Sequence, residues 1–531
     1  MNAANLDVVI VGAGFSGIYM LHKCRTLGLS ARVIEAGSNA GGTWYWNRYP
    51  GARCDVESMT YSYSFDEDLQ QTWRWPERYA TQPEILRYID HVVDRLDLRS
   101  DIQINTKVTG ASFDETTDRW TVVTDGQDRL SAKYCIMATG CLSTPNLPQF
   151  DGLESYKGDW YHTGYWPKGG VDFSGKRVGI IGTGSSAIQS IPVIAAQADH
   201  LTVFQRTPNF SIPAWNGPIG EEKEKAWKKA YPDLRARARV SPVGATFDAP
   251  DISALDFSPE ERDAIFEKRW NEGSFNFLAA FSDLLTSKEA NAYAVDFVHR
   301  KIKQRVKDPT VAELLCPKDH PLGTKRLCVD TDYYETYNRD NVTLVDVKTT
   351  PIAEIVPTGI KVGNTVYELD AIVFATGFDA MTGALQNIDI RGRGGLSFRE
   401  KWADGPSSYL GIAVAGFPNL FTVTGPGSPS VLSNMMVSIE QHIEWIADCI
   451  GQLEKDNRRT IEPKQDAEDK WMAHVNELAG EMLYQDSNTW YLGANIPGKP
   501  RVFLPYVGGV GHYRTVCDDV AARGYEGFSV A

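Results

Sequence analysis

Two glycine-rich motifs in the sequence have the spacing that could hold the pyrophosphate of a dinucleotide. The first, Gly12-x-Gly14-x-x-Gly17, directly follows the apolar run 7–11. Its glycines permit a tight turn and a close approach of backbone to phosphate, and the helix that begins there supplies a positive field. Glu35 closes the next apolar run, where a carboxylate accepts hydrogen bonds from ribose hydroxyls. Together these residues predict a site for FAD or NAD.

The second motif differs from the first in the charge that closes its unit. It reads Gly182-Thr183-Gly184-Ser185-Ser186-Ala187, with alanine in the third glycine position. The next strand ends at Arg206-Thr207, and no acid stands there. A guanidinium at this point suits a ribose 2′-phosphate through forked, charge-assisted hydrogen bonds, which predicts NADP. The alternative interpretation of Arg206 is an ordinary solvated side chain at a strand end.

Each motif is flanked by the elements needed to position it. The first unit reads as strand 7–11, glycine turn, apolar helix ending near Leu27, and strand 31–35; the second reads as strand 176–181, turn, and strand 201–204. Strands that alternate with helices around glycine turns predict an α/β fold with two doubly wound, Rossmann-like dinucleotide-binding domains.

The segment 219–315 has a different character. It is rich in Glu, Lys, Arg and Ala and shows helical periodicity at 259–270, which predicts a helical insertion in the second domain. Strand signals return at 342–347 and 371–374. The expected division is an FAD-binding domain of residues 1–142 and 379–531, an NADP-binding domain of 143–218 and 316–378, and the insertion of 219–315.

Composition narrows the class of protein further. The chain has 531 residues, 42% of them hydrophobic and 23% charged, with a formal net charge of -14. The length predicts two or three domains, and the acidic balance argues against a nucleic-acid partner. The eight cysteines show no C-x-x-C pair and no metal-ligand spacing. We find no signal peptide and no apolar run long enough to span a membrane, so a soluble, cytoplasmic protein is expected.

A third motif makes a family resemblance specific. Tyr156, Gly158, His162, Trp166 and Pro167 are spaced as in the signature F-x-G-x-x-x-H-x-x-x-W-P/D, and the pattern resembles that of the Baeyer–Villiger monooxygenases. Tyr156 stands where phenylalanine is usual. The resemblance covers nearly the whole chain, and it implies that His162 acts from a linker between domains and does not touch substrate. Two Ala-Thr-Gly segments, 138–140 and 375–377, resemble the places where the chain of two-dinucleotide flavoproteins crosses between domains.

The resemblance also implies the residues of the reaction centre. Stretch 41–55 ends in Asp55, a carboxylate whose expected cationic partner is Arg326 of the pair Lys325-Arg326, and Trp490 is expected against NADP. Further residues implied to bind FAD are Phe15, Thr43, Trp44, Trp46, Tyr61, Val108 and Met435. Those implied to bind NADP, besides Arg206 and Thr207, are the second glycine motif, Gln189, Lys325 and Arg326. Met435 also begins an apolar helical stretch, 435–450.

The implied activity is oxidation of a ketone by O₂ and NADPH to an ester or lactone, through a C4a-peroxyflavin whose charge Arg326 would stabilise while Asp55 holds Arg326. Loop 425–433 resembles that of family members acting on aryl or steroid ketones. The nearest alternative is a flavin monooxygenase that oxygenates amine nitrogen or sulfide sulfur, against which Trp166-Pro167 and Lys325-Arg326 weigh. A disulfide reductase would need a second cysteine near Cys54, and a non-enzymatic redox sensor is the remaining possibility.

Overall fold

The first sheet joins the two ends of the chain. The computed structural model describes residues 4–531, and its largest sheet has eight strands in the order β17-β4-β5-β6-β1-β2-β3, with β18 also paired to β6. Its strands are β1 (Ala4–Val11), β2 (Ala31–Ile34), β3 (Ile102–Gln103), β4 (Val108–Asp114), β5 (Arg119–Thr124), β6 (Arg129–Met137), β17 (Asp389–Arg391) and β18 (Leu420–Thr422). β1 lies between parallel β2 and β6, whereas β4 and β5 form antiparallel ladders. Segments after residue 379 therefore complete the sheet that the N-terminal segment begins.

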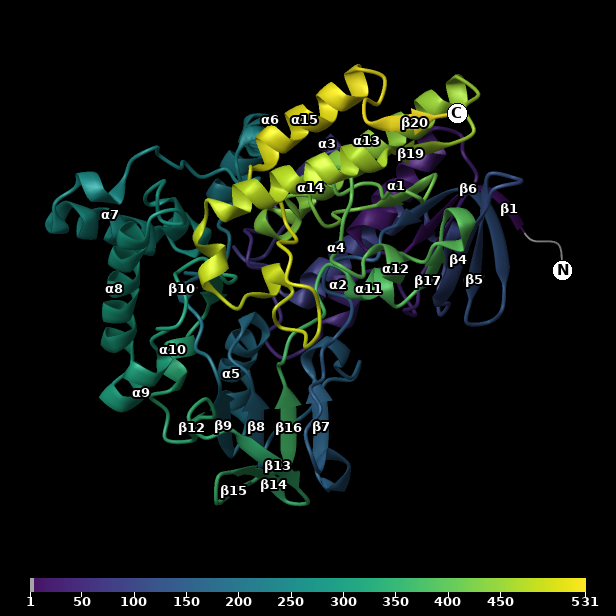
Figure 1. The fold of residues 1–531 in the computed structure, drawn as a ribbon. Helices are drawn as coiled ribbons and strands as arrows, with labels where there is room; N and C mark the ends of the chain where they lie inside the picture. Colours follow the sequence, from purple (N-terminus) through teal and green to yellow (C-terminus); the bar gives the residue numbers. More distant parts are fainter. Residues whose placement is uncertain (1–3) are drawn as a thin grey trace.

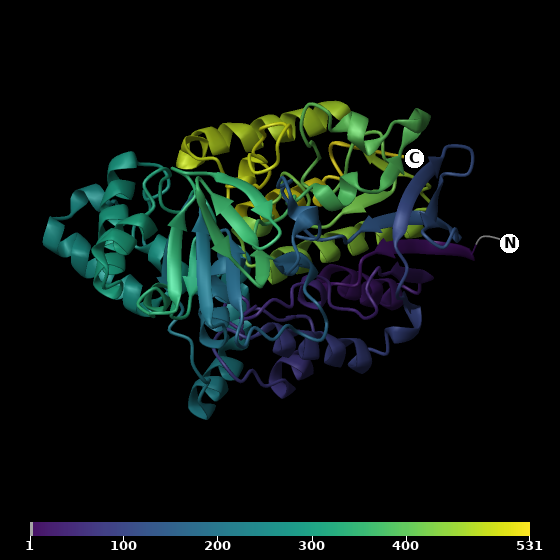
Figure 2. The same ribbon diagram turned by 90° about the horizontal axis from the view of Figure 1, so that it is seen from below.

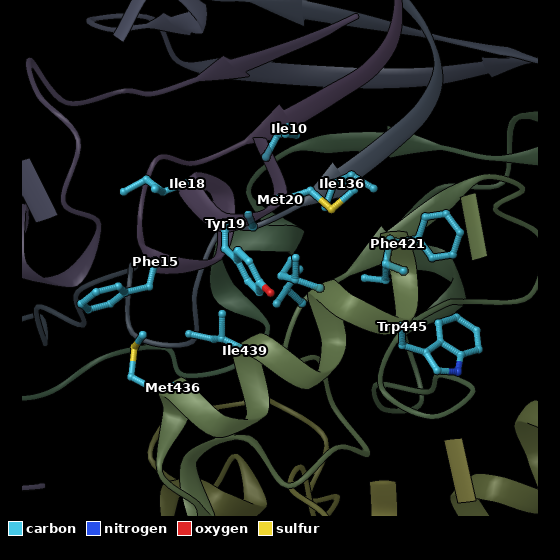
Figure 3. Packing of buried hydrophobic residues seen from close by; sticks show 14 of the residues in the cluster. Ile10, Phe15, Ile18, Tyr19, Met20, Ile136, Phe421, Met436, Ile439 and Trp445 are labelled. Carbon is cyan, nitrogen blue, oxygen red and sulfur yellow. The ribbon is translucent and has the colours of Figure 1, made fainter. Parts of the chain in front are cut away.

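Helices cover this sheet and bury its largest core. α1 (Phe15–Thr26) follows β1, and α13 (Met435–Lys455) packs against it through Tyr19, Met436 and Ile439 (Figure 3). The remaining elements of this part are α2 (Thr43–Trp46), α3 (Glu67–Thr72), α4 (Gln82–Arg95), α11 (Gly383–Gln386), α12 (Phe398–Lys401), α14 (Gln465–Gly480), α15 (Val510–Ala522), β19 (Ile461–Pro463) and β20 (Phe528–Val530).

The second sheet is wholly parallel and has the order β12-β9-β8-β16-β7. It contains β7 (Asp159–His162), β8 (Arg177–Ile181), β9 (His200–Gln205), β12 (Val342–Asp346) and β16 (Ala371–Phe374). α5 (Ser185–Gln197) follows β8, and an antiparallel hairpin sheet of β13 (Ile352–Val356), β14 (Gly359–Val362) and β15 (Thr365–Glu368) lies below it (Figure 1). A short parallel pair, β10 (Ser211–Pro213) and β11 (Cys328–Asp330), lies beside α5. These two sheets confirm the predicted α/β class with two Rossmann-type units.

Segment 219–315 is helical, as predicted, but its helices pack in two directions. It contains α6 (Glu221–Val240), α7 (Pro259–Glu272), α8 (Lys288–Arg305) and α9 (Pro309–Leu315), with α10 (Tyr333–Thr336) following. Phe266 of α7 and Phe297 of α8 join the core cluster of the second sheet, and these helices project at the end of the molecule away from the N-terminus (Figure 2). Tyr231 of α6 instead joins the core around α1, and Arg235 donates to the carbonyl of Thr60 at 3.0 Å. The segment thus contacts both sheets.

Within residues 4–531, no helix combines the length and the apolar character needed to cross a bilayer.

Candidate active site

The first glycine turn is packed too closely to accept side chains. Gly12 has φ +103°, and a Cβ there would lie 2.5 Å from the carbonyl oxygen of Ala138. A Cβ on Gly17 would lie 1.9 Å from the carbonyl oxygen of Gly12, so α1 can begin this close to β1 only with glycine at that position. Gly14 meets Gly42 backbone to backbone, since a Cβ on Gly42 would lie 2.7 Å from the Cα of Gly14. The turn therefore forms a cradle of backbone at the start of α1, the geometry that a pyrophosphate requires.

Glu35 lies at the edge of this cradle, directly after β2. Its Oε2 accepts from the backbone N–H of Ala13 at 2.7 Å, and its Oε1 accepts from that of Gly37 at 2.7 Å. Burial raises the pKa of Glu35, while these two N–H groups and the indole of Trp46 oppose the rise. A buried acceptor that is fixed beside the glycine turn fits the ribose of an adenine dinucleotide.

Aromatic side chains lie on the helix side of the same turn. Phe15 and Tyr61 meet edge to face at 5.6 Å between ring centroids, and the indole N–H of Trp44 donates to the Tyr61 hydroxyl at 3.2 Å. Trp44 belongs to α2, which begins at Thr43, directly after Gly42. The structure thus brings together the residues expected near an isoalloxazine ring from segments 12–17, 41–46 and 61.

The two outlying residues expected near FAD occupy different positions. Val108 begins β4 and is buried in one cluster with Val11 and Ile34, the last residues of β1 and β2. Met435 begins α13 and packs against both the α1 core and the cluster that contains Trp490. Both lie next to the elements that form the first site.

The second glycine turn is more open than the first. Gly182 has φ +110°, and a Cβ there would lie 2.6 Å from the carbonyl oxygen of Ala375. At Gly184, by contrast, a Cβ would point into open space. Ala187 is fully buried where α5 packs on the sheet, whereas Ser185 and Ser186 are half-buried at the start of that helix. The turn therefore leaves room for a phosphate at the N-terminus of α5.

Positive charge gathers where the strands next to this turn end. Arg206 follows β9 and is exposed, and the hydroxyl of Thr183 donates to the carbonyl of Thr207 at 2.8 Å. Burial lowers the pKa of Lys325, and the nearby cations Arg206 and Lys348 lower it further, while Asp319 opposes them. Because Lys325 and Arg206 repel one another, an anion between them would be stabilised by both. This arrangement fits a 2′-phosphate.

Asp55 and Arg326 form a forked ion pair between the two halves of the molecule, the half built on the first sheet, which carries Asp55, and the half built on the second sheet, which carries Arg326. Nε of Arg326 donates to Oδ2 of Asp55 at 3.0 Å, and Nη2 donates to Oδ1 at 2.9 Å. The side chains are 22% and 24% exposed, for Arg326 and Asp55 respectively. Burial opposes the charge of Arg326, but the Asp55 carboxylate outweighs it and raises the pKa of Arg326 above its usual value. Arg326 is therefore a permanent, oriented cation that reaches the first half of the molecule from the second.

Three contacts of Arg326 were not expected as contacts of this residue, although two of them lie in stretches that the sequence had indicated. Nη1 donates to the backbone carbonyl of Val431 at 2.6 Å, and the guanidinium lies 4.5 Å from the ring centroid of Phe275, in the helical segment 219–315. Tyr491 is buried next to Trp490, with 4.3 Å between ring centroids. Burial raises the pKa of Tyr491 to about 12, and the nearby Arg326 opposes that rise. The Trp490 segment and loop 425–433 were indicated by the sequence, whereas Phe275 was not.

His162 lies where the chain crosses between the two sheets. Its Nδ1 accepts from the N–H of Gly164 at 3.0 Å, so Nε2 carries the proton and donates to the carbonyl of Asn146 at 3.3 Å and to the Thr376 hydroxyl at 3.2 Å. Thr376 belongs to crossing segment 375–377, and Asn146 lies six residues after crossing segment 138–140. Burial lowers the pKa of His162, the direction that favours the neutral imidazole. His162 therefore forms hydrogen bonds to both of the chain regions that pass between the two sheets.

The chain is similar to known monooxygenases over almost its full length. Residues 9–216 match the pyridine nucleotide-disulphide oxidoreductase family. A Baeyer–Villiger monooxygenase of Pseudooceanicola batsensis is 46% identical, over 98% of this chain and 96% of its own. A phenazine N-monooxygenase of Lysobacter antibioticus is 43% identical, over 99% of this chain and 97% of its own. The solved structure of an oxidized steroid monooxygenase bound to NADP has a TM-score of 0.96 and 51% identity, covering 99% of each chain.

Proposed function

This chain belongs to the Baeyer–Villiger monooxygenase family, and on that premise we propose that the Asp55–Arg326 pair is its reaction centre. The enzyme uses FAD and NADPH and inserts one oxygen atom of O₂ between a ketone carbonyl and the neighbouring carbon, which yields an ester or a lactone. The forked contact of Arg326 with Asp55 is the observation that carries the assignment of the centre, because it fixes a cation at the junction of the two dinucleotide sites.

The residues of the two glycine turns fit the two cofactors. We assign FAD to the first turn, where Gly12, Gly14 and Gly17 leave a backbone cradle and Glu35 supplies a buried acceptor. We assign NADP to the second, where Arg206 and Lys325 would bind the 2′-phosphate. When bound at these sites, FAD and NADPH would supply the redox chemistry and the activation of O₂, which amino-acid side chains lack.

Arg326 would act by electrostatics. Its guanidinium has one donor edge on Asp55 and another on the Val431 carbonyl, so its position is set before substrate arrives. A preorganised cation stabilises negative charge that develops on oxygen during attack on a carbonyl, and it does so without reorganisation at the moment of reaction. Asp55 would orient Arg326 and balance its charge. Phe275 places an apolar ring over one face of the Arg326 guanidinium.

For the substrate, we propose aryl or steroid ketones as the preferred class. The loop 425–433 supports this proposal, since it resembles loops of family members with those substrates and its Val431 carbonyl contacts Arg326 directly. The 51% identity to a steroid monooxygenase supports it as well. A second candidate is N-oxygenation of a nitrogen heteroaromatic compound, favoured by the 43% identity to a phenazine N-monooxygenase.

We also propose the domain division and the location of the enzyme. The FAD-binding domain would comprise 1–142 and 379–531, the NADP-binding domain 143–218 and 316–378, and the insertion 219–315; the two sheets support the first two. A cytoplasmic location is supported by eight buried, free cysteines, which a reducing compartment preserves.

A substrate panel tests the activity. Linear, cyclic, aryl and steroidal ketones, together with phenazine, would be supplied with NADPH and O₂, and products identified by mass spectrometry. We expect the aryl or steroidal ketones to give the largest amount of ester per NADPH consumed. Ester chiefly from small linear or cyclic ketones would refute the proposed substrate class. N-oxide from phenazine without ester from any ketone would favour the second candidate.

A further inference from the structure

The loop 49–53 of the first half of the molecule lies directly on helix α5 of the second. The Tyr49 hydroxyl donates to Oε1 of Gln189 at 2.9 Å, and Tyr49 packs against the core cluster of the second sheet. Gly51 has φ +79°, and a Cβ there would lie 2.2 Å from the carbonyl oxygen of Gln189. Glycine at position 51 therefore permits backbone-to-backbone contact between the loop and the helix.

The side-chain amide of Gln189 is mostly occupied by this loop. Its Oε1 also accepts from the N–H of Arg53 at 3.3 Å, and its Nε2 donates to the carbonyl of Arg53 at 3.1 Å. A glutamine amide offers two acceptor sites and two N–H donors. Both acceptor sites and one donor are thus used on the loop, and one N–H remains for any other partner. This assignment of the amide accounts for Gln189 better than a role as a ligand of NADP alone.

The loop leads directly into the reaction centre, on which this inference rests. Asp55 stands two residues after Arg53, and it is held from the other side by Arg326, which also belongs to the second half of the chain. The segment that carries Asp55 is therefore held at two points, by Gln189 before it and by Arg326 at it. We propose that Gln189 is a positioning residue that fixes the Asp55 segment, and through it Arg326, relative to helix α5 and the nucleotide at its N-terminus.

We expect disruption of the Gln189 contacts to reduce coupling, that is, the ester formed per NADPH consumed, and to leave the affinity for the cofactor unchanged. The rate of an enzyme reaction can fall strongly when a group that positions the reactants is displaced by about 1 Å. If the loop loosens, hydride transfer from NADPH continues, but oxygen is released as H₂O₂ more often because the Arg326 fork is no longer aligned. NADPH affinity should hardly change, since the proposed contacts of Arg206 and Lys325 with the 2′-phosphate do not involve Gln189.

The test uses the holoenzyme and substitutions on both sides of the contact. Gln189→Met keeps the size of the side chain and removes its hydrogen bonds, and Tyr49→Phe removes one hydroxyl. Each variant should lower the ester formed per NADPH consumed by about three- to tenfold, with the dissociation constant of NADP⁺ within about twofold of wild type. The double variant should be no worse than the worse single variant, because both disrupt one contact. Gln452→Met, on the exposed face of α13, is the matched control and should leave coupling unchanged.

Two results would overturn the inference. One is weakened NADP⁺ binding with coupling intact in Gln189→Met, which would make Gln189 a nucleotide ligand. The other is independent, multiplicative effects of Gln189→Met and Tyr49→Phe. Should Gln189→Met fail to retain FAD, the milder Tyr49→Phe decides by the same two readouts. Failure of the proposed function would differ from both, since wild type itself would then form no ester.

Discussion

Replacing Arg326 by Ala removes two hydrogen bonds to the Asp55 carboxylate and one to the Val431 carbonyl, at 3.0, 2.9 and 2.6 Å. It also removes the cation that these contacts hold in a fixed orientation. Loss of one preorganised donor to a developing oxyanion lowers a rate by about 10²- to 10³-fold, or roughly 3–4 kcal/mol. Ester formation should therefore fall by at least about 100-fold. FAD should stay bound, because Gly12, Gly14, Gly17 and Glu35 are held by contacts that do not involve Arg326.

Two products would be measured in parallel, ester by gas chromatography and H₂O₂ by a peroxidase-coupled assay. We expect NADPH oxidation to continue while H₂O₂ replaces ester, since hydride transfer depends on placement of the nicotinamide more than on this charge. Arg326→Lys should restore only part of the activity, because an ammonium cannot contact both oxygens of Asp55 and the Val431 carbonyl as the planar fork does. Ester formed by Arg326→Ala within about threefold of the wild-type rate would refute the assigned role.

Three further outcomes follow from single contacts. Arg206→Ala should weaken NADPH by about ten- to a hundredfold and NADH far less, as measured by fluorescence titration; equal loss of both would show that Arg206 does not contact the 2′-phosphate. Wild type should purify yellow with non-covalent FAD. Gly17→Ala should purify without flavin, because its Cβ would lie 1.9 Å from the carbonyl oxygen of Gly12. A Gly17→Ala variant fully loaded with FAD would contradict the tight turn. His442 is a fully buried residue of α13, and its burial lowers its pKa from the usual 6.5 to about 3. Its contribution to stability is therefore complete above pH 6.5 and falls by roughly 1.4 kcal/mol per pH unit as the pH drops below that value. Between pH 6.5 and 4.5, the melting temperature of His442→Gln should therefore fall less than that of wild type. Parallel curves of melting temperature against pH for the two proteins would count against this reasoning.

Local spacing explains most of what the sequence predicted correctly. Strands 201–204 and 371–374 and the helix beginning at Met435 appear where apolar patterning placed them, because periodicity and flanking turns are encoded within each segment. Where prediction and structure differ, the reason is the segment that a strand pairs with or that a helix packs against. β1 begins at Ala4 and not at residue 7 because its first residues pair with Leu130–Ala132 of β6. α6 contacts the first sheet although its sequence neighbours α7 and α8 join the second.

The sequence by itself determined the two glycine turns and the contrast between Glu35 and Arg206, since each depends on residues within one β-α-β unit. It also indicated Asp55 and Arg326 as partners, through family resemblance. Only the tertiary structure decided what surrounds that pair: the Val431 carbonyl, the Phe275 ring, and the hold of Gln189 on the loop before Asp55. A backbone carbonyl leaves no side-chain signature, and contacts between segments far apart in the chain depend on how two sheets dock, which local spacing does not encode.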